Sequence, residues 1–306
     1  MTQTQAAEPT PILVEQRFPL DLAHTIASIR DLYDCGKKAR WDPNSDIPWG
    51  RIDLSIHDTA TIEAARLSWS RRAWTEWTGL PETPALLIRF CLEAGREADP
   101  KYYLSLRNTE EAWHVECCHH FAKALGGYIE MPANAAYAEL FNRNFHKRVL
   151  DADRSLDAYV AAHCALDDGI DLELWRGYLG NATDLVAKKI LELCVEDKKR
   201  HAAFGWFYLE KRAPALSDAD KELIAGEVVD HLRDVVFHGY HCASLVPGGA
   251  GKEVVDADRM TAAAGLGALD SDAERKILAD YLDIAYGKFA TLGIAVDRLD
   301  IPAAMS

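Results

Sequence analysis

The segment NTEEAWHVE, residues 108–116, contains Glu111 and His114 three residues apart. On an α-helix, residues at positions i and i+3 lie on one face, so these two side chains can point at one metal ion. A single Glu-x-x-His pair also occurs by chance on solvated acidic helices. The surrounding helices therefore decide whether the pair belongs to a metal site.

The composition places the chain among water-soluble globular proteins. Its 306 residues are 49% hydrophobic and 27% charged, and the net charge is -14. An acidic chain is a poor general binder of nucleic acid or of anionic membranes. It contains no apolar run of 18 or more residues, so no membrane span is expected. The first residues show no basic region followed by an apolar core, so no secretory signal is expected. Seven scattered cysteines without a Cys-x-x-Cys pair favour a reduced, cytoplasmic location.

Proline, glycine and capping residues divide the chain into helices. Residues 1–20 are polar and are expected to form a loose arm, and residues 21–306 a single helical domain with a bundle core at about 82–212. Helices are expected over 20–38, 58–78 and 273–292. Thr83 is expected to cap the next helix, with Pro84 as its first residue, and the chain is expected to break at Asp99-Pro100. From Pro100 a second helix is expected to run to Gly126-Gly127.

The chain repeats one pattern, in which an acidic residue on one helix is followed by a histidine on the next. Glu82 precedes Glu111 by 29 residues, and Asp168 precedes Lys198 by 30. Lys198 lies three residues before His201, as Glu111 lies three before His114. Carboxylate bundles hold two metals with one Glu from each of two helices and a Glu-x-x-His from each of the other two.

Three segments resemble the ferritin-like diiron-carboxylate oxidoreductases. The segments EEAWHVE (110–116) and DKKRHAAFGW (197–206) are similar to the two helices that usually read Asp-Glu-Ala-Arg-His and Asp-Glu-x-Arg-His in that family. The segment PETPALL (81–87) looks like its first ligand helix, and the similarity extends over about residues 30–295. The resemblance implies an all-α fold, a ferritin-like four-helix bundle with additional N- and C-terminal helices.

The resemblance also implies a metal site that holds one or two iron ions, with manganese as the other metal that could bind. Its ligands would be Glu82, Glu111, His114, Asp168 and His201. Asp168 stands where the family has Glu. Lys198 stands where the family has a glutamate ligand, and a charged lysine cannot bind a metal. If Lys198 points inward, it would pair with Asp168 or Glu111 and resist metal loading at one half of the site.

Several interpretations of Lys198 remain open. Asp197 or Glu196 could supply the missing carboxylate if the helix is rotated or bulged. A desolvated Lys198 with a lowered pKa could act as a catalytic base or nucleophile. It could also be exposed, because residues 197–200 form a charged run. Among the other histidines, His231, His238 and His241 fall on an expected late helix, where either a second metal site or ordinary packing would account for them.

The resemblance implies a non-haem iron, or Fe/Mn, oxidoreductase that activates O2 or peroxide to oxidise a small organic substrate. The resemblance leaves open whether an electron-donor protein is a partner and whether the chain forms a homodimer. The alternative is a metal-free binding or structural protein in which Lys198 replaces an ion, or a redox reaction that depends on Lys198. The fold does not choose between these reactions.

Overall fold

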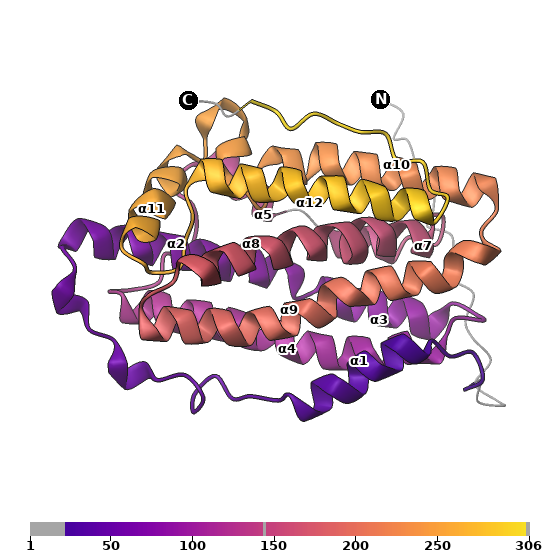
Figure 1. Ribbon diagram of the computed structural model, residues 1–306, viewed down its shortest axis with the longest axis horizontal. Helices are drawn as coiled ribbons and strands as arrows, with labels where there is room; N and C mark the ends of the chain where they lie inside the picture. The colour runs from indigo at the N-terminus through magenta and orange to yellow at the C-terminus, as the bar shows by residue number, and fades with distance from the viewer. Residues whose placement is uncertain (1–21, 143–144, 304–306) are drawn as a thin grey trace, which may run out of the picture.

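The computed structural model describes residues 22–142 and 145–303. These residues form an all-α fold, as the sequence predicts, in which long helices run side by side along the molecule (Figure 1). The predicted N-terminal arm, residues 1–20, lies outside the described residues. None of the helices in the described ranges combines the length and hydrophobicity needed to span a bilayer.

The bundle is built from two antiparallel helix pairs. In the first pair, α2 (Thr59–Gly79) and α3 (Glu82–Leu92), which follow each other along the chain, pack against α4 (Ala98–Ala124). In the second pair, a continuous helical segment packs against α9 (Leu185–Arg212). That segment consists of α7 (Leu156–Tyr159), a π-helix (Val160–Asp167) and α8 (Asp168–Asn181). The helix pairs predicted from the repeated pattern are therefore present, and α2 adds a further helix along α4.

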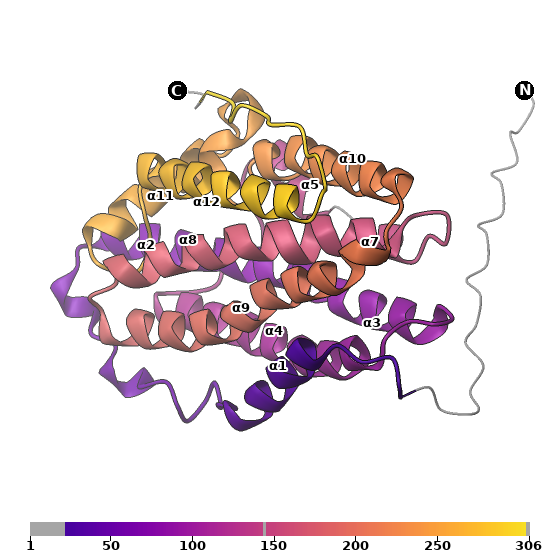
Figure 2. The same cartoon turned by 45° about the vertical axis from the view of Figure 1, so that its right-hand side comes forward.

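Other helices cover the bundle on several sides. α1 (Ala27–Lys38) packs on α4 and α9, α12 (Ser271–Thr291) on α8, and α11 (Lys252–Ala263) on α2. α10 (Asp218–Asp234) packs on α7 and the π-helix, and it lies beside α12 in both views (Figures 1 and 2). The remaining helices are short: α5 (Ala135–Phe141), α6 (Phe145–Val149), and 3-10 turns at Trp49–Arg51, Leu54–Ile56, Ala213–Ala215, Val236–His238, Ala243–Leu245 and Pro247–Gly249.

Capping side chains explain several helix starts. The Asp58 carboxylate accepts a hydrogen bond from the Thr61 backbone N–H at the start of α2, and Asp184 caps α9 in the same way. Ser217 and Asp220 form a reciprocal capping box at α10. Such side chains satisfy backbone N–H groups that have no partner within the helix.

Three predicted boundaries are wrong. α1 begins at Ala27 rather than near residue 20. The N-cap of α3 is Pro81, because the Thr83 hydroxyl instead donates to Glu111 Oε1 at 2.8 Å. α3 ends at Leu92, well before Asp99-Pro100. These two residues lie in the first turn of α4, close to the predicted start at Pro100, where proline is tolerated because its missing N–H would have had no partner.

The π-helix packs against α9 at a close backbone contact. A Cβ atom added to Gly205 would lie 2.2 Å from the Cys164 carbonyl carbon and 2.3 Å from the Ala165 nitrogen. Only glycine allows this approach, and it brings residues 163–168 next to the middle of α9. The large hydrophobic core surrounds this contact, with Tyr103 and Phe204 fully buried and stacked 5.2 Å apart.

Candidate functional site

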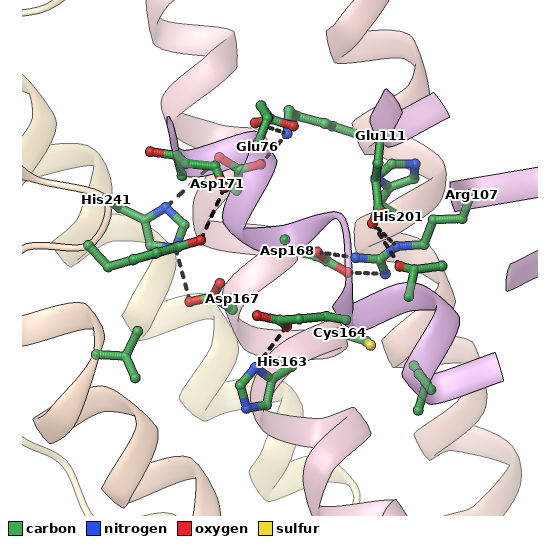
Figure 3. Close-up of a pocket in the computed structure, with 18 of the residues that line it drawn as sticks. Glu76, Arg107, Glu111, His163, Cys164, Asp167, Asp168, Asp171, His201 and His241 are labelled. Carbon is green, nitrogen blue, oxygen red and sulfur yellow. Dashed lines mark hydrogen bonds and ion pairs between the residues drawn. The ribbon is translucent and has the colours of Figure 1, made fainter. Parts of the chain in front are cut away.

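A buried polar cavity lies between the two helix pairs (Figure 3). It offers about 70 Å³ of space, enough for a few water molecules or a small ligand group. Six carboxylates line it, against one lysine and one arginine. They are Glu76 from α2, Glu82 from α3, Glu111 from α4, Asp167 at the end of the π-helix, and Asp168 and Asp171 from α8. Four histidines also line it: His163, His201, His231 and His241.

Lys198 is buried and paired with two carboxylates. Its ammonium group donates to Glu76 Oε1 at 2.9 Å and to Asp171, and it lies 4.6 Å from the centre of the Trp175 ring. Only 4% of the residue is exposed, so the exposed interpretation is wrong. The expected partners, Asp168 and Glu111, are also wrong, because these acids pair with another cation.

The charge of Lys198 is strongly stabilised. Burial alone would lower its pKa, but Asp171 and Glu76 raise the pKa well above its usual range. The lysine therefore holds its proton at neutral pH, which argues against the interpretation as a base or nucleophile with a lowered pKa. Its predicted catalytic role is otherwise untested.

Arg107 is the second internal cation of the cavity. Its two terminal nitrogens donate to both carboxylate oxygens of Asp168, at 2.6 and 2.9 Å, and its Nε donates to Glu111 Oε1 at 2.8 Å. Figure 3 shows the guanidinium group between these two acids. Two of the predicted metal ligands are thus joined by an arginine.

His114 is buried behind the cavity rather than in its lining. Its Nδ1 lies 3.3 Å from Glu76 Oε2, and its Nε2 lies 3.2 Å from Asp197 Oδ2. Asp197 also accepts a hydrogen bond from the Trp41 indole N–H at 2.9 Å. Burial lowers the pKa of His114, but the hydrogen bonds to Asp197 and Glu76 outweigh this effect and raise the pKa to about 9. Asp197 is therefore engaged with His114 and Trp41 and does not replace the carboxylate missing at position 198.

His201 lines the cavity as a neutral imidazole. Its Nε2 lies 2.9 Å from Glu110 Oε2, and Glu110 in turn accepts a hydrogen bond from Arg200 at 2.5 Å. Burial and the nearby Arg107 hold the pKa of His201 well below its usual range. Its other ring nitrogen is thus the atom that could serve as a ligand.

Glu82 lies away from the other predicted ligands. Its Oε2 accepts a hydrogen bond from the Tyr159 hydroxyl at 3.1 Å and lies 3.6 Å from His163 Nδ1. Burial and the charge of Asp167 raise the pKa of Glu82 to about 7. The acid of the first helix pair that reaches Lys198 and His114 is Glu76, six residues earlier on α2.

Histidines gather around Asp167 at the same end of the cavity. Asp167 Oδ1 lies 2.8 Å from His231 Nε2 and 2.9 Å from His241 Nε2. The centre of the His163 ring is 4.4 Å from that of His231. In Figure 3, His241 lies between Asp167 and Asp171. We call Glu82, His163, Asp167, His231 and His241 the histidine end, and Glu76, Arg107, Glu111, Asp168, Asp171, Lys198 and His201 the lysine end.

The expected late helix does not carry all three late histidines. α10 ends at Asp234, so His231 lies on it, while His238 lies in a 3-10 turn and is bonded to the Arg233 carbonyl at 2.7 Å. Gly239 follows in a left-handed turn with φ of 90°, and His241, two residues later, contacts Asp167. His238 and His241 therefore do not share a helix face.

The predicted ligands do not form a metal site in the described conformation. Within residues 22–142 and 145–303, no three His, Cys, Asp or Glu side chains are arranged to hold an ion. Glu111 and Asp168 contact Arg107, His114 contacts Glu76 and Asp197, and Glu82 lies at the other end of the cavity. The residues that sequence reasoning missed are Glu76, Arg107, Asp167 and Asp171. The four-residue spacing of Arg107 and Glu111 was the one available signal.

Comparisons with known proteins agree on the fold. No protein-family model matches the chain, and no curated protein matches its sequence. Among solved structures, an R2-like ligand-binding oxidase with an aerobically reconstituted metal cofactor after photoconversion is 17% identical, with a TM-score of 0.65, over 92% of this chain and 96% of that one. One with an aerobically reconstituted Mn/Fe cofactor (long soak) is 15% identical, with a TM-score of 0.63, over 88% and 94%.

An R2-like ligand-binding oxidase without metal cofactor gives a similar result. It is 16% identical, with a TM-score of 0.61, over 85% of this chain and 96% of that one. This chain therefore has the fold of the R2-like ligand-binding oxidases, which confirms the predicted ferritin-like architecture. Its cavity differs in residue type from the ligand set that the sequence resemblance implies.

Proposed function

We propose that this protein is a metal-dependent oxidoreductase that uses iron, or manganese with iron, to activate O2 or peroxide and oxidise a small organic substrate. Two observations support the proposal. The fold is shared with R2-like ligand-binding oxidases along nearly the whole chain. The centre of the bundle holds a buried cavity with more carboxylates than cations, which is an environment that attracts a metal cation.

The excess of carboxylates is the observation that carries the proposal. Burial raises the pKa of Asp168 to about 7 even though Arg107 opposes this, and burial also raises the pKa of Glu111. The buried Oε2 of Glu111 has no hydrogen-bond partner. Lys198 and Arg107 pair with four of the six cavity acids, so the cavity as a whole has more carboxylates than permanent cations, and an added cation would be stabilised away from those two cations.

A two-metal centre with the predicted ligands does not fit the lysine end. Lys198 pairs with Glu76 and Asp171, and Arg107 pairs with Glu111 and Asp168, so four carboxylates are already bound to internal cations. Close pairs of metal ions need such carboxylates to offset their charge. We therefore expect about one metal ion per chain rather than two.

When bound, a redox-active metal would supply the chemistry that O2 or peroxide requires. The chain's own residues enclose the cavity, keep bulk water out and hold the acids in place. Lys198 orients Glu76 and Asp171, and Arg107 orients Asp168 through two parallel hydrogen bonds. A cytoplasmic location, an electron-donor protein and a homodimer remain predictions from the sequence.

The test is the metal content of protein expressed in iron- and manganese-supplemented medium, compared with Lys198→Glu. We expect about one metal in the wild type and up to two in Lys198→Glu, because the substitution removes an internal cation and supplies a carboxylate. Lys199→Glu is the matched control, since Lys199 is exposed and pairs with Glu196. A wild type that binds no metal under any loading would overturn the proposal.

The second candidate is a metal-free binding or structural protein. The pairing of Lys198 and Arg107 with four cavity acids favours it, because these cations lie where ions would otherwise balance charge. A metal-free wild type whose stability is unchanged by added Fe²⁺ or Mn²⁺ would support this candidate. A redox reaction of Lys198 itself has less support, because the lysine stays protonated.

A further inference from the structure

We propose that one divalent metal ion, iron or manganese, binds at the histidine end of the cavity, with His231, His241 and Asp167 as ligands. This inference deepens the proposed function and rests on it, because it identifies where the metal of that oxidoreductase would bind. It departs from the ligand set that the sequence resemblance implies, in which none of these three residues takes part.

The geometry of Asp167 is the first argument. The Nε2 atoms of two histidines lie 2.8 and 2.9 Å from the same oxygen, Asp167 Oδ1. The three residues come from the end of the π-helix, from α10 and from the segment that follows Gly239. Two imidazoles and a carboxylate are a common ligand combination for iron and other divalent transition metals, with open positions left for reactants.

Two further donors lie beside these three residues. His163 belongs to the same π-helix, its ring is 4.4 Å from the His231 ring, and its Nδ1 lies 3.6 Å from Glu82 Oε2. π-Helical segments occur frequently at functional sites, and this one positions both His163 and Asp167.

The charges explain why this end is preferred over the lysine end. Among the described residues, Asp167 forms ion pairs with His231 and His241 and with no lysine or arginine. Lys198 and Arg107 remain charged and would repel an ion placed among their own carboxylate partners.

Lys198 has a positioning role in this arrangement. It holds Asp171, whose Oδ1 lies 3.9 Å from His241 Nδ1, on the side of the ring opposite Asp167. A metal-binding histidine commonly has its other ring nitrogen oriented by a carboxylate, which fixes the tautomer. The lysine that prevents a two-metal site would thus help to orient a ligand of the single site.

In the described conformation, hydrogen bonds close this cluster. No three donors are close enough to one point to hold an ion, because Asp167 contacts both imidazoles through hydrogen bonds. Metal–imidazole bonds are about 2.0–2.1 Å long, shorter than these contacts. Binding of an ion therefore requires the three side chains to rotate toward it.

The first experiment measures Mn²⁺ binding to the purified, metal-depleted full chain by equilibrium dialysis and elemental analysis. The double variant His231→Gln/His241→Gln should bind Mn²⁺ more than tenfold more weakly, because even residues that only orient ligands contribute about 10–100-fold. The control His119→Gln/His238→Gln removes two histidines outside the cavity and should bind as the wild type does. Equal binding by both double variants and the wild type would overturn the inference.

The second experiment needs no variant, so it remains decisive if the double variant does not fold. Anomalous diffraction from wild-type crystals soaked in MnCl2 should show one peak adjacent to His231, His241 and Asp167. A peak adjacent to Glu111 and His201 instead would overturn this inference and leave the proposed function standing. Absence of Mn²⁺ and Fe²⁺ binding in any measurement would overturn both.

Discussion

The two ends of the cavity neutralise their buried carboxylates in different ways. At the lysine end, Lys198 and Arg107 are permanently charged and each binds two acids. At the histidine end, Asp167 is bound by His231 and His241, which can lose their protons. A permanent cation fixes the structure, whereas a histidine can exchange its proton for another cation. The comparison shows that one bundle fold can support both arrangements within the same cavity.

The largest effect is expected from Lys198→Met. The substitution leaves Glu76 and Asp171 buried without their cation, and breaking a buried ion pair in this way costs about 3–5 kcal/mol. Urea unfolding at neutral pH measures the loss. Lys199→Met, on the exposed face, should change the free energy of unfolding by less than about 0.5 kcal/mol. Equal stability of the two variants would show that the lysine end is not held together by charge.

Gly205→Ala should have the next largest effect, and it sharpens the comparison because it acts at the π-helix. The new Cβ would collide with the backbone at Cys164 and Ala165, and overpacking of this kind costs about 1–3 kcal/mol. Displacement of the π-helix should also weaken Mn²⁺ binding at Asp167. Thermal unfolding and Mn²⁺ dialysis measure the two effects.

Gly226→Ala is the control for that substitution. Gly226 lies within α10 with open space around its Cα, so alanine there should stabilise the protein by about 0.4–1 kcal/mol. If both glycine variants gained stability, the close contact between α9 and the π-helix would not constrain the histidine end.

The smallest expected effect is on the pH dependence of stability, and it arises from Glu274, an acid that belongs to neither end of the cavity. Burial and Asp258 raise the pKa of Glu274 to about 7, although Arg71 opposes this. Between pH 4.5 and about 7, the folded chain therefore keeps the proton on Glu274, whereas the unfolded chain has lost it. The associated stability is present below pH 4.5 and is lost as pH rises through 7.

Glu274→Gln should remove this contribution to the pH dependence. Relative to the wild type, the variant should become more stable as pH increases from about 4.5 to 7, as measured by urea unfolding at several pH values. The amide can keep the hydrogen bond that the Tyr178 hydroxyl donates at 2.8 Å. A constant stability difference across this range would contradict a raised pKa for Glu274.

Local signals were sufficient to predict most helices but not all of their boundaries. The predicted helices over residues 58–78 and 273–292 correspond closely to α2, Thr59–Gly79, and α12, Ser271–Thr291. Pro100 correctly marks the start of α4, because proline is tolerated in the first turn of a helix, but it does not mark the end of α3, which is Leu92. The prediction that Thr83 caps α3 is wrong, because the Thr83 hydroxyl donates its hydrogen bond to Glu111, a residue on another helix.

The site was harder to predict than the helices. Glu111, Asp168, Lys198 and His201, which the spacing relates to one another, all line one cavity. The spacing could not show that Glu76, rather than Glu82, faces Lys198, because both acids lie on the first helix pair and only the packing of α2 distinguishes them. Nor could it show that Arg107 joins Glu111 to Asp168, since that contact spans two helices 61 residues apart.

The sequence by itself determined the all-α architecture, because periodicity, caps and breakers act between residues that are close in the chain. It also determined that a cation stands where the resemblance implies a ligand. Only the tertiary structure decided which acids that cation meets and how His231 and His241 reach Asp167. Those contacts depend on the packing of separate helices and on the left-handed turn at Gly239, which no local pattern specifies.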